Sequence, residues 1–447
     1  MDITLEKKDK VNAFIKINLK EADYKEKYTS KLKEYGKKAQ LKGFRPGHVP
    51  PSLIEKMYGK SILVDEINSL LSTSIMDYIK TNQIDILGEP MPQKEDAERI
   101  DWDNQKDFNF TYNLGLTPEF QMEISDKIVF DNYKINYGDK IVKETIENLR
   151  KQFGTYSDVD TISIDDILYA DAKDLATGKV YKSITPMNRV SEASLKVLKT
   201  KKVGDKYVED LNVVYPESAS IAYALGIDKK EAETLSGSFE FTIERISSPQ
   251  GAELDETFFK KVFRTENITD YATFEAKLKE NIAQNYQMEG KNALANDIFD
   301  YYTKNTKIEF PTEFLKDWLY VANEGKLTKD QIEEQYPSFE TSLRWDLIKN
   351  KVAKDFEIKV EHNEVMDRAR AMVQSQFGLQ GQLEEEMQKI VDQWADNLLK
   401  RDNGKEYRKM FEEIYSDKVI ETISGKVKLK DISIDIEEFK KKREAKK

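Results

Sequence analysis

The first 115 residues of the chain switch between two hydrophobic patterns. Every second residue is apolar from Val11 to Leu19, and again from Phe108 to Leu116, as in strands with one buried face. Between these stretches apolar residues recur every three or four positions, which predicts one helix over 24–39 and another over 67–79. Gly88 and Pro90 end the second helix. We therefore predict a β-α-α-β domain over residues 1–115 that buries one core.

A short loop of unusual composition joins the two predicted helices. The segment Gly43–Pro50 reads GFRPGHVP, and its glycines and prolines make it a rigid, non-repetitive turn. Phe44 and Arg45 stand inside it without helical or strand neighbours, as the residues of a contact tip would. Around the loop, from Lys31 to Lys60, there are eight lysines and arginines and two glutamates. This charge favours a polyanionic partner, although a solvated basic helix face gives the same pattern.

The remainder of the chain divides into three further segments. Residues 116–153 run from an extended stretch into a helix, and residues 154–247 consist of short apolar runs between turns, as in a small β-rich domain. Residues 248–447 are mostly helical by the spacing of their apolar residues, and Pro311 stands at the first turn of one helix. Alternation returns from Ile432 to Ile436. The pattern therefore predicts an α+β protein of several domains.

Composition excludes several classes of chemistry. The chain has no cysteine and two histidines, so it lacks the residues for thiolate catalysis, disulfides or a histidine-based metal site or triad. It contains neither a P-loop nor a dinucleotide-binding glycine pattern, and we expect no cofactor. A net charge of −11 makes it a poor general binder of nucleic acids. It has no signal peptide and no apolar run near the roughly 20 residues that cross a bilayer, so we expect a cytoplasmic protein without membrane partners.

Methionine and phenylalanine recur at helical spacing in the C-terminal region. Core packing explains most such residues. A helix with about a third of its residues charged buries only a narrow stripe, however, so some apolar positions must face a cleft or a partner. Methionine adapts its shape to varied apolar ligands. Both interpretations, helical core and apolar binding cleft, apply to Met366, Met372, Phe377 and Met387.

Several short segments of the chain are similar to segments of one known family. Residues 39–50 read AQLKGFRPGHVP, and they are followed by TPEF at 117–120, LRKQ at 149–152 and IEFP at 308–311. In this order they resemble bacterial trigger factor, a ribosome-associated chaperone. The resemblance spans nearly the whole chain. It is strongest in the GFRxGxxP element between two helices, which is a specific signal.

The resemblance implies that the loop docks beside the ribosomal exit tunnel. In that family it touches a ribosomal protein and nearby rRNA. Arg45 suits a carboxylate or a phosphate, Phe44 suits a pocket, and the flanking lysines suit rRNA. Pro46 departs from the family, in which many relatives have a basic residue there, and this removes a charge from the tip. The ribosome-binding residues that the resemblance implies are Lys42, Gly43, Phe44, Arg45, Gly47 and Pro50.

The resemblance also implies an architecture and a mechanism. The implied architecture comprises a ribosome-binding domain (1–115), a linker that packs with the C-terminal domain (116–153), an FKBP-like domain (154–247) and an elongated all-α chaperone domain (248–447). In the family the helical part forms two arms around a cradle, which shields nascent or unfolded polypeptides without ATP. Members can form homodimers away from the ribosome.

The FKBP-like domain raises the question of enzymatic activity. The family's prolyl isomerase pocket is lined by aromatic residues and carries an I-P-G-[FW] turn. This chain has Thr185-Pro186-Met187 instead, and no aromatic residue from Pro186 to Lys206. We expect a degenerate isomerase domain with little or no activity. Two alternatives stay open: an active peptidyl-prolyl isomerase, and a holdase or assembly chaperone that works without the ribosome.

Overall fold

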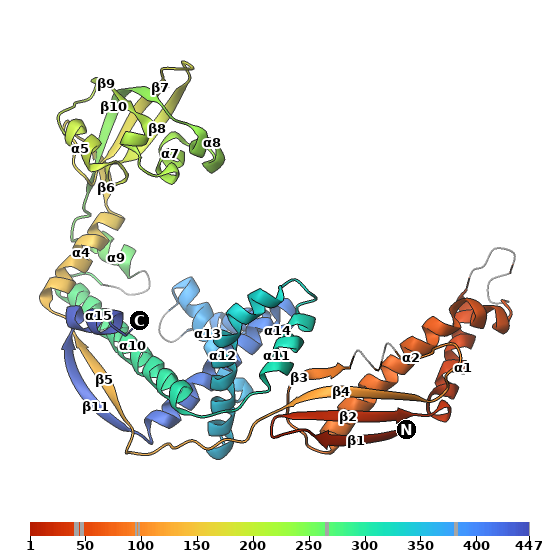
Figure 1. Ribbon diagram of the computed structural model, residues 1–447. Helices are drawn as coiled ribbons and strands as arrows, with labels where there is room; N and C mark the ends of the chain where they lie inside the picture. Colours follow the sequence, from red (N-terminus) through yellow and green to blue (C-terminus); the bar gives the residue numbers. More distant parts are fainter. Residues whose placement is uncertain are drawn as a thin grey trace. The chain divides into compact units, whose positions relative to one another are not determined.

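The computed structural model describes residues 1–446 except 40–43, 45–48, 94–95, 97–98, 264–267 and 380–382. Figure 1 shows the chain coloured along its sequence. Its internal contacts divide it into two compact units, each made of three segments. Unit 1 comprises Met1–Phe130, Ala295–Lys359 and Ser416–Lys428, and unit 2 comprises Asp131–Leu294, Val360–Tyr415 and Leu429–Lys447. The C-terminal helical region is therefore shared between the two units.

The N-terminal part of unit 1 is an antiparallel sheet covered by a long helix. Its elements are β1 (Asp2–Lys7), β2 (Asn12–Leu19), α1 (Glu21–Lys38), α2 (Pro51–Thr81), β3 (Ile86–Pro92) and β4 (Phe108–Leu116). The strand order is β1-β2-β4-β3. Alternate residues of β2 and β4, such as Ile15 and Phe108, share one core with Ile67, Leu71 and Ile75 of α2. This is the β-α-α-β domain that the alternating pattern predicts.

Two elements of this domain differ from the predicted ones. The helix α2 begins at Pro51 rather than near residue 67, because its first half packs on α1 and buries few side chains, which hides the helical period. The strand β3 contains Gly88 and Pro90, the residues predicted only to stop a helix. Proline is tolerated in β3 because this is an edge strand, and its register with β4 shifts between Leu87 and Met91.

A helical segment of unit 1 packs on the same sheet. It contains the end of α10 (Tyr271–Asn305), α11 (Thr312–Ala322) and α12 (Lys329–Asp355). The helix α11 contacts β3 and β4 at two glycines. A Cβ atom on Gly115 would lie 2.6 Å from the ring of Phe314, and one on Gly88 would lie 2.9 Å from the ring of Trp318. The absence of a side chain at both positions lets the helix approach the strands closely.

Unit 2 contains a five-stranded sheet with short helices, as predicted for the middle of the chain. Its strands are β6 (Thr155–Asp158), β7 (Ile167–Asp174), β8 (Val180–Pro186), β9 (Lys206–Asp210) and β10 (Ser238–Gln250). Its helices are α5 (Glu192–Leu198), α6 (Leu211–Val214), α7 (Ser218–Leu225) and α8 (Lys229–Thr234). The order is β6-β10-β7-β8, and β9 also pairs with β10. Phe239 and Phe241 of β10 lie at the centre of its core.

Two strands from distant parts of the chain pair in a small sheet. The strand β5 (Val129–Asn136) pairs with β11 (Lys428–Asp435), which is the alternating tail predicted from sequence. Alternation is predicted to continue to Ile436, but this residue begins the helix α15 (Ile436–Glu444). The C-terminal region, predicted to be all helical, therefore includes one strand among its described residues.

The other helices of unit 2 form two groups. In the first, α4 (Asp139–Phe153) and α9 (Glu256–Val262) share a phenylalanine-rich core with the start of α10. The second comprises α13 (His362–Phe377) and α14 (Glu385–Ser424), of which the part from Ser416 onward belongs to unit 1. The backbone of α14 leaves the helical conformation from Arg401 to Gly404, so its two halves are separate helices that fold on α13. We call this second group the arm.

Candidate functional site

The two ends of the predicted docking loop are anchored in the N-terminal domain. The amide of Ala39 donates to the carbonyl of Tyr35 at 2.8 Å and closes α1, and the amide of Leu53 donates to the carbonyl of Pro50 at 3.0 Å and opens α2. Val49 and Ile54 are buried next to the second end. Pro50 is the N-cap of α2, where its fixed φ of −58° suits the entry into a helix.

The tip of this loop is only partly within the described residues. Phe44 is described, and its side chain is 42% exposed. Exposure of a phenyl ring is costly in water, so a ring held there is available to a partner. Four of the predicted ribosome-binding residues lie outside the described residues: Lys42, Gly43, Arg45 and Gly47.

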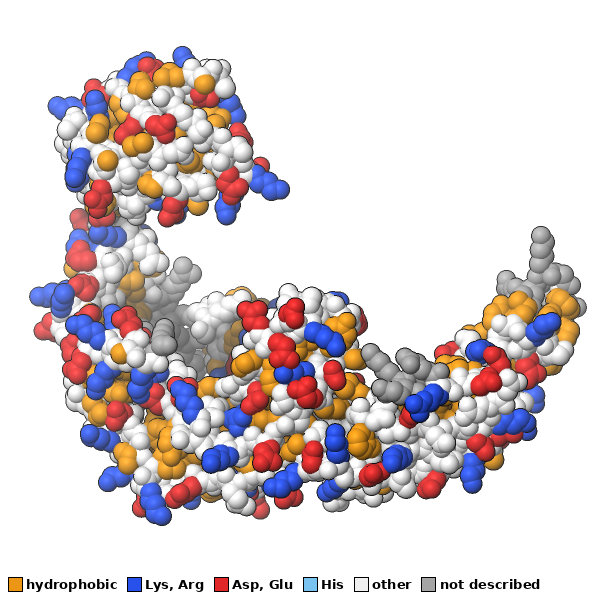
Figure 2. All heavy atoms as spheres, viewed as in Figure 1, with side chains coloured by type: hydrophobic (Ala, Val, Ile, Leu, Met, Phe, Trp, Pro, Cys, Tyr) orange, Lys and Arg blue, Asp and Glu red, His pale blue; other side chains and the backbone are white. Residues whose placement is uncertain are grey.

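Exposed apolar side chains also lie on the helices beside the loop. The helical period places Tyr35 on the same face as Tyr24, but Tyr35 is 48% exposed, because this end of α1 faces the start of α2 rather than the sheet core. Its ring lies 6.0 Å from the ring of Tyr58. Met57 is exposed on the same turn of α2. Figure 2 shows hydrophobic side chains gathered on the surface at this end of the domain.

The arm holds the residues predicted to bind an apolar partner. Met366 packs against the arm's core, so for this residue the core interpretation holds. Met372, Phe377 and Met387 are exposed, Phe377 to 55%. The ring of Phe377 lies 4.5 Å from the ring of Trp394, which is itself 40% exposed. The structure thus joins Phe377 to a residue absent from the predicted set.

A helical stripe on α14 continues the exposed apolar surface. Met387, Ile390 and Trp394 are all exposed, and their spacing of three and four residues puts them on one side of the helix. This spacing was the signal that could have identified Ile390 and Trp394 from sequence. The core positions Val391 and Ala395 occupy the neighbouring side and pack on α13. We call Phe377, Met387, Ile390 and Trp394 the arm patch.

A charge cluster holds α13 and α14 together beside this surface. Arg370 of α13 donates to Asp392 of α14 at 2.7 Å and pairs with Asp367 on its own helix at 2.7 Å. Gln388 also donates to Asp392, at 3.0 Å. The hydrogen bonds from Gln388 and Arg370 lower the pKa of the Asp392 carboxyl. The carboxylate therefore stays charged at neutral pH, which keeps the two helices in register.

Most aromatic residues of the middle domain (residues 154–247) fill its interior, whereas Tyr156 and Tyr223 are exposed. The ring of Tyr207 stacks on Phe241 at 4.9 Å, and Tyr215 is almost completely buried. The hydroxyl groups of Tyr215 and Thr185 are 2.6 Å apart, and those of Thr185 and Ser183 are 2.8 Å apart. Burial raises the pKa of both tyrosines, so they are neutral. These aromatic residues lie outside the stretch from 186 to 206 in which the sequence has none.

Two further features bear on the kind of site. Among the described residues, no three histidine or acidic side chains gather closely enough to hold a metal ion. Within the same residues, no helix combines the length and hydrophobicity that crossing a bilayer requires.

Comparison with known proteins identifies the family. Residues 1–149 match the sequence model of "Bacterial trigger factor protein (TF)", residues 156–250 that of "Probable trigger factor, FKBP-like domain" and residues 291–442 that of "Probable trigger factor, C-terminal domain". The three matches follow one another in chain order and cover most of the sequence. The chain belongs to the trigger factor family. The resemblance seen in the loop sequence is thereby confirmed, and so is the three-part fold of this trigger factor homologue.

Individual relatives carry the same name. The trigger factor of Francisella tularensis subsp. mediasiatica is 26% identical over 335 residues, which cover 73% of this chain and 72% of the relative. The trigger factor of Rickettsia conorii is 26% identical over 344 residues, with 74% and 73% coverage. A solved structure from work on promiscuous substrate recognition by the trigger factor chaperone aligns with 95% of this chain at 14% identity and a TM-score of 0.48, a likeness too distant to add to the assignment.

Proposed function

We propose that this trigger factor homologue is an ATP-independent chaperone of the cytoplasm that docks at the ribosomal exit tunnel and shields nascent polypeptides. Membership of a chaperone family supports the general class. The observation that carries the docking part is the exposed Phe44 ring on a loop whose two ends are anchored. The hydrogen bonds of Ala39 and Leu53 hold the two ends of the loop on helices α1 and α2, and the exposed ring of Phe44 can enter an apolar pocket of a partner.

The loop's chemistry fits a ribosomal surface. Phe44 provides an apolar anchor for a protein pocket, and Arg45 beside it can pair bidentately with a carboxylate or a phosphate. From the sequence we expect Gly43, Gly47 and Pro50 to determine the turns of the loop rather than to make contacts. Lys42 and the lysines of α1 add positive charge in a chain of net charge −11, which steers this end of the domain towards RNA.

Co-sedimentation with ribosomes at low salt tests the docking. We expect Phe44→Ala/Arg45→Ala to lower the affinity by about tenfold or more, because removing one anchor residue costs about 1.4 kcal/mol or more. Met76→Ala is the matched control, since it removes another exposed apolar side chain from the same domain. Equal co-sedimentation of the loop variant and the wild type would refute the docking. Persisting client protection would then identify a ribosome-independent holdase.

We assign client binding to exposed apolar side chains of the helical region, above all Met372 and the arm patch. Each offers a small apolar contact, and a polypeptide that has not folded can engage several at once. A client that buries its own apolar segments no longer gains from these contacts and leaves, so no nucleotide is needed. A homodimer formed away from the ribosome would cover such surfaces, and we include it in the proposal.

The middle domain, in this proposal, has little or no prolyl isomerase activity. The packing of Tyr207 and Tyr215 in its interior supports this, because a substrate proline would have to displace buried side chains. An assay of cis–trans isomerisation in a short proline peptide tests the point with the full chain. We expect the uncatalysed rate. A rate that rises in proportion to protein concentration would establish the active isomerase instead.

A further inference from the structure

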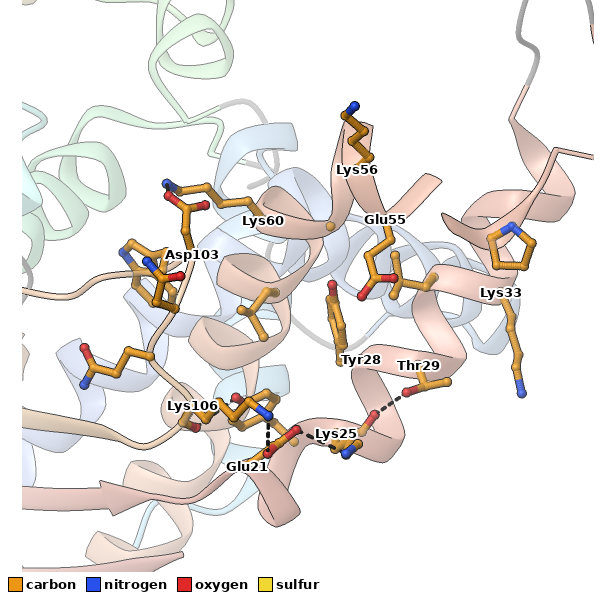
Figure 3. A pocket seen from close by; sticks show the side chains of 18 residues that line it. Glu21, Lys25, Tyr28, Thr29, Lys33, Glu55, Lys56, Lys60, Asp103 and Lys106 are labelled. Atoms are coloured by element: carbon orange, nitrogen blue, oxygen red, sulfur yellow. Dashed lines mark hydrogen bonds and ion pairs between the residues drawn. The ribbon is translucent and has the colours of Figure 1, made fainter. Parts of the chain in front are cut away.

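A cleft opens between α1, α2 and the segment 102–106 of the N-terminal domain (Figure 3). Its volume is about 810 Å³, within the range of small-ligand sites. Tyr28, Leu63 and Trp102 form an apolar floor and pack against the domain core. Gly59 leaves room for Tyr28, because a Cβ atom there would lie 2.9 Å from the tyrosine hydroxyl oxygen. The floor is therefore built into the fold rather than formed by loose surface side chains.

Lysines and carboxylates form ion pairs on the rim of this cleft. Glu21 pairs with Lys25 at 3.1 Å and with Lys106 at 3.5 Å, and Asp103 pairs with Lys60 at 2.9 Å. The lysine side chains are more than half exposed, and ion pairs of this kind contribute only about 0–1 kcal/mol. A polyanion can therefore displace these carboxylates from the lysines at small cost.

Two further lysines of the rim have no such partner among the described residues. Neither Lys33 of α1 nor Lys56 of α2 forms an ion pair with another described residue, and Glu55 is the one carboxylate beside them on the rim. Figure 3 shows both lysines reaching outward, away from the aromatic floor. From Lys20 to Lys60 the chain has eleven lysines and arginines and five carboxylates, in a protein of net charge −11. The cleft thus lies in the basic part of an acidic chain.

We propose that this cleft binds a single-stranded segment of RNA, with the lysine rim on its phosphates and the Tyr28–Trp102 floor against a base. A basic rim over an aromatic floor is the combination that single-stranded nucleic acids require. An acidic peptide would satisfy the lysines but would leave the aromatic floor without a flat partner. The inference rests on the proposed function, because docking on the ribosome is what would bring this cleft to RNA as a second contact beside the loop.

Fluorescence anisotropy with a short labelled single-stranded RNA tests the cleft in the full chain. We expect Lys33→Gln/Lys56→Gln to weaken binding about five- to tenfold. The slope of log affinity against log salt should also fall by about 0.7 for each phosphate that the variant no longer neutralises. Lys143→Gln/Lys196→Gln makes the same charge change on exposed lysines of unit 2 and should leave affinity and slope unaltered. Identical affinities and slopes for all three proteins would overturn the assignment.

Two more measurements separate this site from its alternatives. Unlabelled RNA should displace the probe better than polyglutamate of equal charge, and equal displacement would overturn the RNA assignment in favour of an acidic peptide. Phe44→Ala should keep its affinity for free RNA, whatever it does to ribosome pelleting. A loss of RNA binding in Phe44→Ala but not in Lys33→Gln/Lys56→Gln would place the RNA site in the loop and overturn the cleft. The docking proposal and the cleft thus fail in different assays.

Discussion

Asp431 shows how a single side chain can connect two strands that lie almost 300 residues apart in the chain. Its carboxylate accepts hydrogen bonds from Lys134 at 2.6 Å and from Asn132 at 2.7 Å, and so links β11 to β5. Lys134 first, and Asn132 with it, lower the pKa of Asp431 below the ordinary 3.8. A carboxyl whose pKa is lower in the folded state adds stability above its unfolded pKa, and this stability disappears as the pH falls through the folded value.

We therefore predict an acid-dependent effect of Asp431→Asn. At pH 7 the variant should show faster hydrogen exchange in peptides spanning β11 than the wild type. As the pH falls through the lowered pKa of Asp431 in the folded protein, the two proteins should converge, because the wild-type carboxyl then becomes protonated too. Pulse-labelled exchange after equilibration at each pH measures this. Asp160→Asn is the control, since Asp160 is exposed and has no ion pair or hydrogen bond with another described residue. If hydrogen exchange in β11 still differs between Asp431→Asn and the wild type at low pH, the prediction is wrong.

Residue types indicate which side chains are able to make contacts, but burial decides which of them do. Phe44 is exposed, as a contact residue must be, and the loop composition was enough to single it out. Met366 and Met372 are alike in sequence, yet only Met372 is exposed, because Met366 faces the arm's core. Trp394 could not be paired with Phe377 from sequence, since the contact depends on how α13 and α14 fold together.

At the scale of helices and strands, local pattern predicted elements whose partners lie nearby in the chain. Apolar and polar residues alternate in β2 and β4 because one face of each strand is buried, and both strands appear as expected. The pairing of β5 with β11 could not be predicted from the sequence, because hydrogen bonds between residues 299 positions apart leave no local pattern. The helical pattern of the sequence, by contrast, divides into 383–400 and 407–423, and so it predicts the break that the backbone makes at Arg401–Gly404.

The contact of α11 with the sheet gives a prediction at this scale. Valine at position 115 would place a side chain where Phe314 lies 2.6 Å and Pro311 lies 2.9 Å from the Cβ position. Overpacking of this kind costs about 1–3 kcal/mol, and we expect Gly115→Val to release α11 from β3 and β4 while the sheet itself stays folded. Hydrogen exchange should rise in α11 but not in β2.

A glycine with free space around it provides the control for this variant. Gly138 has no heavy atom within 4 Å of its Cβ position and an ordinary φ of −87°, so Gly138→Val should leave exchange in α11 unaltered. Equal protection of α11 in Gly115→Val and the wild type would show that the close approach does not hold the helix on the sheet.

For the whole molecule, the division into two units separates the two proposed activities. The loop with Phe44 belongs to unit 1, and the arm patch belongs to unit 2. The two sites share no residue and no core. The free-energy effects of mutations at independent sites are additive. Docking and client shielding should therefore be separable by mutation.

We predict opposite losses for two variants. Phe377→Ser/Trp394→Ser should protect an aggregating client about tenfold less well in a ribosome-free assay. Complete burial of a large apolar side chain contributes about 1.5–3 kcal/mol, but these two are already half-buried, so we expect a loss of about 1.4 kcal/mol in total. It should pellet with ribosomes like the wild type. Phe44→Ala should do the reverse. Val180→Ser/Val208→Ser removes exposed apolar side chains from the middle domain and should preserve both activities. If the arm variant also failed to bind ribosomes, the arm would have to contribute to docking, and the assignment of one activity to each unit would be wrong.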